Sequence, residues 1–275
     1  MQKKIAVIND LSGYGRCSLT VAIPVLSAMG HQCCPIPTAI LSNHTEFPVY
    51  FFDDYTEKMT TYTDKWKELG LSFDAIATGF LGSEAQIGIV MEIVQKLKTE
   101  KTFVVVDPVM GDHGHAYETY TPEMCEQMKE LVCMADVVLP NVTECCILTD
   151  TPYREENWTR KELLNMAMML RLMGAKSVVI TGVREGSYYT NVVLERGQME
   201  AKFIRTRSSG GERPGTGDVF SSVVAGALLN GKSLPEAVSQ AAGFVKECIK
   251  VSDEEQIPHA NGVCFEKILG KLIKK

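Results

Sequence analysis

The stretch Gly215-Thr216-Gly217-Asp218 contains the residues of this chain whose types and spacing best suit chemistry. It joins a Gly/Ser-rich loop, Ser208 to Pro214, to an apolar helical run that begins near Val219. Two glycines let the backbone turn its amides toward one point, and the positive end of the helix dipole is aimed there too, so an anion fits. Asp218 is then explained as a base that takes a proton from a substrate hydroxyl while the amides hold a transferring phosphoryl group. The pattern predicts a kinase without a Walker loop, although Gly-x-Gly-Asp is also a common turn with a helix N-cap.

The elements that position this stretch follow from alternation between short β-branched runs and longer amphipathic segments. Strand-like runs cover residues 5–8, 75–78, 103–106, 137–139 and 178–181, and helix-like segments cover 18–29, 84–97, 122–134 and 160–173. Such alternation predicts parallel strands joined by crossover helices. Pro122 at a first-turn position and the capping-box spacings Thr159/Glu162 and Ser233/Glu236 support the helix starts.

The rhythm changes between Ser187 and Arg205, where two strand-like runs flank the turn Glu195 to Gln198. These runs predict an antiparallel hairpin at one edge of the sheet. Further helices are expected near residues 234–251 and 263–273. Because no repeat or low-complexity linker interrupts the chain, we expect residues 1–275 to form one α/β domain. Its fold should be a three-layer α/β/α sandwich around a mostly parallel central sheet.

Composition restricts the possible partners and compartment. A net charge of −6 and an isoelectric point near 5.5 argue against a nucleic-acid surface. The sequence enters an apolar strand without a charged-then-apolar leader, and no later run reaches a membrane-spanning length, which predicts a cytoplasmic protein without a membrane partner. The nine cysteines include no Cys-x-x-Cys pair and lie in apolar contexts, so reduced, buried thiols are expected rather than disulfides or zinc ligands.

Polar residues directly follow the predicted strands, at the end where ligands gather in an open parallel sheet. These residues are Asn9, Asp10, Ser12, Gly79, Phe80, Asp107, Asn141, Glu144, Thr181 and Gly182. Magnesium prefers oxygen ligands and keeps waters held by carboxylates, so Asp107 and Glu144 are the carboxylate candidates for a phosphate and magnesium site. Each position also has a simpler explanation, because Asp107 before Pro108 can end a strand, Asn141 can form an Asx turn and Glu144 can favour a helix N-terminus.

Four segments resemble, in type and overall order, those of the pyridoxal kinases of the ribokinase-like superfamily. They are Gly215-Thr216-Gly217-Asp218 with Val219-Phe220, Asp107-Pro108-Val109-Met110-Gly111-Asp112, Ser42-Asn43-His44-Thr45 and Pro140-Asn141-Val142-Thr143-Glu144. The similarity runs from residue 5 to about residue 250 and includes Ser12-Gly13-Tyr14-Gly15. The first two segments are shared with related vitamin kinases, whereas Ser-Asn-His-Thr is much more particular to pyridoxal kinases. The substrate assignment therefore depends mainly on that tetrapeptide.

The resemblance implies ATP-dependent phosphorylation of the 5′-hydroxymethyl group of pyridoxal, pyridoxine or pyridoxamine. It implies that Asp218 is the catalytic base, that the amides of Gly215, Thr216 and Gly217 form the anion hole, and that Asp107 and Glu144 order Mg²⁺ and its waters. By the same resemblance Asn141 and Thr181 lie near the nucleotide phosphates, Asp112 lies on a loop beside them, and Thr45 and Phe80 line the pyridine pocket. A homodimer and assistance from a monovalent cation such as K⁺ are also implied.

Two positions depart from the pyridoxal kinase pattern. Asp10 stands where many pyridoxal kinases have a serine that contacts the ring, and we expect Asp10, with Ser12, to face a polar or protonated ring group. Phe80 replaces a tyrosine that is often found at its position. Because Asp10 followed by Ser12-Gly13 is also similar to hydroxymethylpyrimidine kinases, a kinase of thiamine synthesis is the first alternative. A catalytically idle vitamer-binding protein, which need not keep Asp218, is the alternative from another class.

Overall fold

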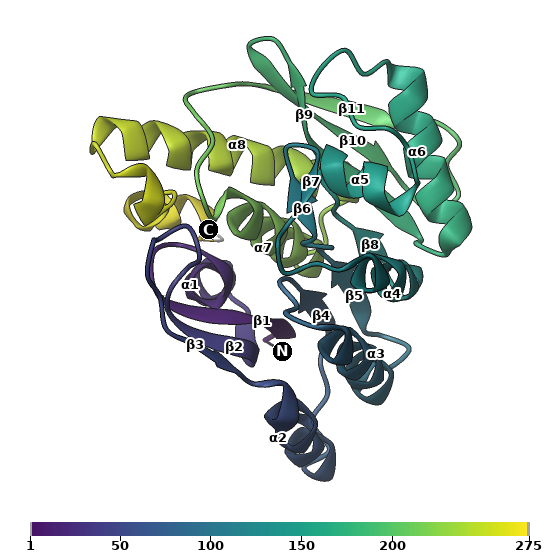
Figure 1. Cartoon of the computed structure of the whole chain (residues 1–275), viewed down its shortest axis with the longest axis vertical. Helices are drawn as coiled ribbons and strands as arrows, with labels where there is room; N and C mark the ends of the chain where they lie inside the picture. The colour runs from purple at the N-terminus through teal and green to yellow at the C-terminus, as the bar shows by residue number, and fades with distance from the viewer. Residues whose placement is uncertain (1, 274–275) are drawn as a thin grey trace.

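The computed structural model describes residues 2–273 and places a nine-stranded sheet at their centre. The strand order is β11-β10-β9-β8-β5-β4-β1-β2-β3, as Figure 1 shows. The bounds are β1 Lys4–Tyr14, β2 Gln32–Asn43, β3 Phe52–Asp54, β4 Ala75–Thr78, β5 Phe103–Val106, β8 Val137–Val138, β9 Ser177–Glu185, β10 Tyr188–Leu194 and β11 Lys202–Arg207. A separate ribbon pairs β6 (Gly111–Asp112) with β7 (His115–Ala116).

The six central strands, β9 through β2 in the sheet order, pair in parallel. Strands β10 and β11 form the predicted antiparallel hairpin at one edge, and β3 pairs antiparallel with β2 at the other. The predicted α/β sandwich with a mostly parallel sheet and an antiparallel edge hairpin is therefore confirmed. The parallel strands β1, β4, β5 and β8 point the same way, so their carboxyl ends lie together along one side of the sheet, the carboxyl edge. The predicted site residues directly follow these strand ends.

Helices cover both faces of the sheet. One face carries α1 (Ser18–Ala28), α7 (Thr216–Leu229), α8 (Leu234–Glu254) and the 3₁₀ helix η2 (Glu266–Leu272). The other carries α2 (Thr56–Glu68), α3 (Glu84–Leu97), α4 (Pro122–Cys133), α5 (Val142–Leu148) and α6 (Arg160–Met173). Alternate strand residues serve the two cores, because Ile5 and Val7 belong to the α1–α7–α8 core whereas Ala6 and Ile8 belong to the opposite one.

Several boundaries differ from the sequence prediction. Strand β1 continues past Ile8 to Tyr14, because its pairing with β2 resumes after a bulge between Asn9 and Leu11. The helix expected over residues 263–273 is the shorter η2, whose terminal bonds run from the amide of residue i+3 to the carbonyl of residue i. The 3₁₀ turn η1 (His259–Asn261) precedes it.

The nine cysteines are all free, as expected, and five of them are buried. The prediction of burial was wrong for Cys133, which is exposed at the end of α4, where its thiol contacts the carbonyl oxygen of Met173. Within residues 2–273, no helix has the length and apolar character needed to cross a membrane.

Candidate active site

The first turn of α7 forms a backbone cradle at the carboxyl edge of the sheet. Gly215 precedes the helix with φ 78°, a left-handed conformation that glycine adopts without strain. A Cβ atom at this position would lie 1.8 Å from the carbonyl oxygen of Arg16, so only glycine fits. The first-turn amides of an α-helix have no intrahelical acceptors, and the positive end of the dipole is here. The amide of Thr216 has a long contact of 3.4 Å to the carbonyl of Arg213, and Gly217 is exposed. The arrangement suits an anion.

Asp218 lies in this first turn, with its carboxylate held by a donor from β1. The side-chain amide of Asn9 donates to Asp218 Oδ1 at 3.2 Å. Burial, with a smaller contribution from the nearby charge of Asp10, raises the pKa of Asp218 from the usual 3.8 to about 6. The group is therefore ionised near neutral pH yet basic enough to accept a proton.

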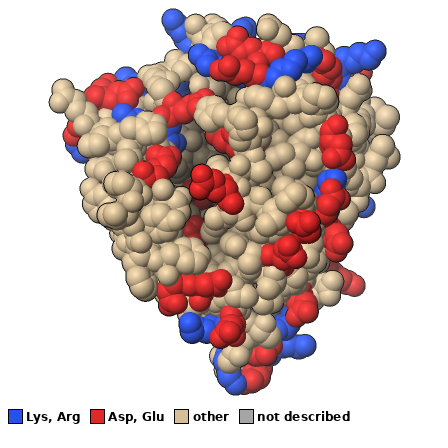
Figure 2. Space-filling view, viewed as in Figure 1, with Lys and Arg blue, Asp and Glu red and all other residues tan. Residues whose placement is uncertain are grey.

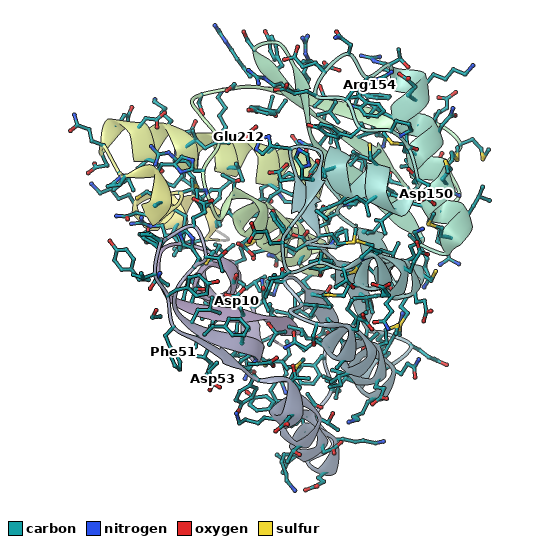
Figure 3. The ribbon with its side chains drawn as sticks, viewed as in Figure 1. Asp10, Phe51, Asp53, Asp150, Arg154 and Glu212 are labelled. Carbon is teal, nitrogen blue, oxygen red and sulfur yellow. The ribbon has the colours of Figure 1, made fainter. Side chains whose placement is uncertain are left out.

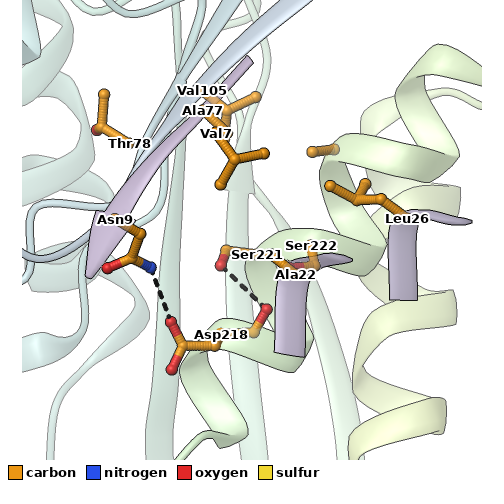
Figure 4. Close-up of a pocket in the computed structure, with 11 residues that line it drawn as sticks. Val7, Asn9, Ala22, Leu26, Ala77, Thr78, Val105, Asp218, Ser221 and Ser222 are labelled. Carbon is orange, nitrogen blue, oxygen red and sulfur yellow. Dashed lines mark hydrogen bonds between the residues drawn. The ribbon is translucent and has the colours of Figure 1, made fainter. Parts of the chain in front are cut away.

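Figure 4 shows the Asn9 amide facing the Asp218 carboxylate, with the Ser221 hydroxyl 3.4 Å from the backbone oxygen of Asp218. Behind them lies a cavity of about 20 Å³, between β1, β4, β5 and the helices α1 and α7. That volume is room for one water molecule. A substrate must therefore reach Asp218 from the opposite, open side.

Asn9 is a residue whose role the sequence analysis did not assign. Its side-chain oxygen accepts the backbone N–H groups of Phe80, at 2.9 Å, and Asp10, at 3.0 Å. Its amide is thereby oriented toward Asp218. Gly79 leaves the necessary space, because a Cβ atom there would lie 2.3 Å from Asn9 Nδ2. A polar residue at the end of an apolar run was visible in the sequence, but its partner 209 residues away was not.

Asp10 and Ser12, expected to contact the ring, are both buried. The Ser12 hydroxyl donates to Asp10 Oδ2 at 2.9 Å, and the Ser18 hydroxyl donates to Asp10 Oδ1. Burial raises the pKa of the Asp10 carboxyl above its usual value, and these hydroxyl donors oppose that rise. Both oxygens of Asp10 thus have partners inside the protein, and its contact with a substrate ring stays a prediction.

Asp107 and Glu144 bring two further carboxyl groups to the same edge. Asp107 directly follows β5, and burial together with the charge of Asp218 raises its pKa. Glu144 is buried in α5, where Oε1 accepts the N–H of Met110 at 3.1 Å and Oε2 accepts the N–H of Asn141 at 2.8 Å. Burial and the charge of Asp107 raise the pKa of Glu144. Bringing a cation near would favour the ionised form of both groups.

This pair of carboxylates suits a magnesium ion that keeps most of its waters, rather than a metal ion enclosed by protein ligands. Within residues 2–273, no group of three or more His, Cys, Asp or Glu side chains is placed to enclose a metal ion. Mg²⁺ commonly uses one or two carboxylates and keeps several waters. Because both oxygens of Glu144 already accept backbone N–H groups, Asp107 is the candidate direct ligand and Glu144 the candidate partner of a metal-bound water.

The residues expected at the nucleotide lie beside this pair. The Asn141 side chain caps α5, accepting from the N–H of Glu144 at 2.9 Å and donating to the carbonyl of Gly111 at 2.9 Å. Asn141 also forms a parallel bridge with Thr181 of β9. Asp112 is exposed on the β6–β7 ribbon. That ribbon is tied to the Ser208–Pro214 loop, because His113 Nε2 lies 3.2 Å from Glu212 Oε2.

The Ser-Asn-His-Thr segment lies at the end of β2. Thr45 is exposed, whereas the buried His44 ring contacts the carbonyl of Ala260 at 2.7 Å. Phe80, at the end of β4, is half-buried. Figure 2 shows a hollow in this face of the molecule with Asp and Glu side chains around it, and Figure 3 labels Asp10 and Glu212 in the same view. The structure therefore brings the strand-end residues and α7 to one edge, while the individual roles of these residues stay predictions.

Comparison with known proteins identifies the family. A model of the phosphomethylpyrimidine kinase family matches residues 22–264. The chain belongs to this family. It is 29% identical to the pyridoxine kinase of Bacillus subtilis over 262 residues, which are 92% of this chain and 85% of that protein. It is 32% identical to the hydroxymethylpyrimidine/phosphomethylpyrimidine kinase of Aquifex aeolicus over 174 residues, 62% of this chain and 66% of that one.

A solved structure extends the similarity to the whole fold. A Bacteroides thetaiotaomicron protein, provisionally assigned as a phosphomethylpyrimidine kinase and crystallised with pyridoxal, superimposes with a TM-score of 0.94. It is 40% identical, and the match covers 99% of this chain and 96% of that one. The predictions of a ribokinase-like fold and of a kinase are confirmed.

Proposed function

We propose that this kinase transfers the terminal phosphoryl group of ATP to the 5′-hydroxymethyl group of pyridoxal, pyridoxine or pyridoxamine. The observation that carries the proposal is the position of Asp218, a carboxylate of raised pKa in the first turn of a helix that follows a glycine cradle. The Ser-Asn-His-Thr segment and the similarity to a pyridoxine kinase and to a protein crystallised with pyridoxal support the vitamer as acceptor.

In this mechanism the vitamer hydroxyl lies beside Asp218, on the open side of the carboxylate. As the oxygen attacks the phosphorus atom, its proton moves to Asp218 and the bond from phosphorus to the ADP oxygen breaks. The amides of Gly215, Thr216 and Gly217 stabilise charge on the phosphoryl oxygens. Asp107 and Glu144 would hold Mg²⁺ and its water, and the bound ion would neutralise charge on the phosphates. The nucleotide is bound by Asn141, Thr181 and Asp112, and the vitamer ring is bound by Thr45 and Phe80.

A hydroxymethylpyrimidine kinase is the second candidate, because the matching family model is named for phosphomethylpyrimidine kinase and the Aquifex aeolicus relative is named for both hydroxymethylpyrimidine and phosphomethylpyrimidine. Both candidates use an alcohol acceptor and the same transfer groups, so they differ in ring recognition alone. An idle vitamer-binding protein would have no use for the Asn9 donor that orients Asp218.

We further propose a single kinase domain over the chain, a cytoplasmic homodimer, and a monovalent cation such as K⁺ as activator. A cluster of exposed apolar side chains near the β2–β3 edge supports an interface between two copies. Val49 is 78% exposed and Phe51 is 64% exposed, and Tyr50 and Phe52 lie beside them. Large exposed apolar clusters commonly mark protein contacts.

The test compares phosphorylation of pyridoxal, pyridoxine, pyridoxamine and hydroxymethylpyrimidine at equal concentration, with ³¹P NMR to identify the product. We expect a B6 vitamer to have the highest kcat/KM. Asp218→Ala should still bind the vitamer but lose turnover by roughly 10²-fold or more, the usual scale for a positioned base. Asp64→Ala, at an exposed position of α2, is the matched control. Preferred turnover of hydroxymethylpyrimidine would select the second candidate, and binding without turnover of any of the four would reject both.

A further inference from the structure

A segment near the end of the chain passes between the loops of the site. It covers residues 257–263, between α8 and η2, and is called the strap below. In Figure 1 the yellow turns that follow α8 lie next to α1. The amide of Ile257 donates to the backbone oxygen of Ser252, and the amide of Cys264 donates to its hydroxyl. Both ends of the strap are therefore fixed to α8.

Three carbonyl oxygens of the strap accept side-chain N–H groups from three separate loops. The pairs are Arg213 with Ile257 at 2.8 Å, His44 with Ala260 at 2.7 Å, and Arg16 with Asn261 at 3.0 Å. A further bond runs from the amide of Val263 to the carbonyl of Pro214, at 3.1 Å, directly before the glycine cradle. The strap therefore joins the Ser-Asn-His-Thr segment to the start of α7.

The partners of His44 define its protonation state. A carbonyl oxygen only accepts, so Nε2 carries the proton that is donated to Ala260. The other ring nitrogen, Nδ1, accepts the backbone N–H of Glu46 at 3.3 Å and so carries no proton. The ring is therefore the neutral Nε2–H tautomer. Since both nitrogens have partners in the protein and the residue is 8% exposed, neither nitrogen is available to a substrate.

The His44 ring also packs against the loop between β1 and α1. Gly15 in this loop has φ 90°, and a Cβ atom there would lie 2.3 Å from His44 Cδ2. The ring of Phe47 lies 4.8 Å from the His44 ring, measured between centroids. The next residue of the loop, Arg16, has its carbonyl oxygen against Gly215. Contacts thus run without a break from the end of β2 to the cradle.

We infer that His44 is a positioning residue, whose Nε2–H donates to the strap and thereby fixes the ring-binding segment relative to Asp218. This inference rests on the proposed function, in which Thr45 binds the vitamer ring and Asp218 accepts the proton of its hydroxyl. His44 itself transfers no proton and forms no bond to substrate. Because the segment with Thr45 and the loop before Asp218 are bonded to the same strap, a vitamer bound at one is placed for reaction at the other.

The test compares His44→Phe with His44→Gln. Phenylalanine keeps an aromatic ring but has no donor, whereas glutamine has an Nε2 amide the same number of bonds from Cα and keeps the donor. We expect kcat for pyridoxal to fall by roughly 10²-fold in His44→Phe, the effect of a misplacement of about 1 Å. The fall should be roughly fivefold smaller in His44→Gln, which keeps that hydrogen bond. KM for ATP should change little in either variant, because the lost contact lies on the acceptor side of the site.

His31 provides the matched control at the other end of β2. It is buried like His44, and its Nε2 lies 2.9 Å from the carbonyl oxygen of Gly226 in α7. We expect His31→Phe to lower thermal stability without lowering kcat. Equal kcat in the two His44 variants would overturn the inference, since the donor would then have no role. A loss confined to KM for the vitamer would also overturn it, because the ring would then act as a direct substrate contact.

Nuclear magnetic resonance of the unaltered protein supplies a measurement that does not depend on turnover. The ¹⁵N shifts of His44 should identify the neutral Nε2–H tautomer, and a proton on Nδ1 would contradict the inference. The amide of Val263 should exchange with solvent faster in His44→Phe than in His44→Gln, and equal exchange would contradict the connection through the strap. Absence of kinase activity in the unaltered protein would instead refute the proposed function, so the two failures are distinguishable.

Discussion

Replacing Asp218 by asparagine should abolish catalysis and stabilise the fold. Burial raises the pKa of Asp218 from 3.8 to about 6, so the ionised carboxylate destabilises the folded state. At about 1.36 kcal/mol per pH unit, this difference corresponds to about 3 kcal/mol. Because the folded state binds the proton more tightly, the contribution of this group to the free energy of unfolding falls as pH rises from about 4 to about 6 and is constant above that range.

Asparagine removes the charge but also one acceptor. Asn9 Nδ2 can still donate to the remaining oxygen, but the new NH2 group stands where the second oxygen was, and leaving it without an acceptor costs about 1 kcal/mol. The expected net gain is about 2 kcal/mol near pH 7.5. At about pH 5 the destabilisation from the carboxylate is roughly halved, so the gain should fall below about 1 kcal/mol.

Urea unfolding of both proteins at the two pH values measures this difference. Asp64→Asn is the matched control, because the hydrogen bond from Lys96 lowers the pKa of partly exposed Asp64, and its removal should not stabilise the protein. Phosphorylation by Asp218→Asn should fall by roughly 10²-fold or more. Lower stability of Asp218→Asn than of the unaltered protein near pH 7.5, or a gain that is larger at pH 5, would refute the reasoning.

Two further substitutions examine the cradle and the metal pair. Gly215→Ala should lower both stability and kcat, because its Cβ would lie 1.8 Å from the Arg16 oxygen. The control is Gly231→Ala, which also has positive φ (83°) but lies in open space, and it should lower thermal stability alone. Glu144→Gln should raise the Mg²⁺ concentration needed for half-maximal rate by roughly tenfold, measured by metal titration, with exposed Glu123→Gln unchanged. Equal effects within either pair would contradict the assigned geometry.

The fold was largely predictable because its signals are local. Alternating runs gave the core strands and most helices, and the capping boxes at Thr159/Glu162 and Ser233/Glu236 are present as expected. Strand β2 was missed, and Pro35 and Pro37 within it are residues that normally argue against a strand. Its pairing with β1 overrides that local preference.

The site was predictable only in part, because some of its residues act through tertiary contacts rather than local signals. Strand-end position correctly gathered Asp107, Asn141 and Glu144 at one edge, since parallel strands end together, and the Gly-Thr-Gly-Asp motif added Asp218 of α7. The donor that orients the base was not identified, because Asn9 acts through a tertiary contact that no spacing records.

The contact between Asn9 and Asp218 joins the first strand to a helix synthesised more than two hundred residues later. During translation, the central strands can therefore assemble on the ribosome while the phosphoryl-transfer centre does not yet exist. Closing so long a loop is slow, so refolding in vitro should restore the spectroscopic signature of the sheet before it restores turnover. The site is therefore complete only when α7, which carries Asp218, has docked against β1.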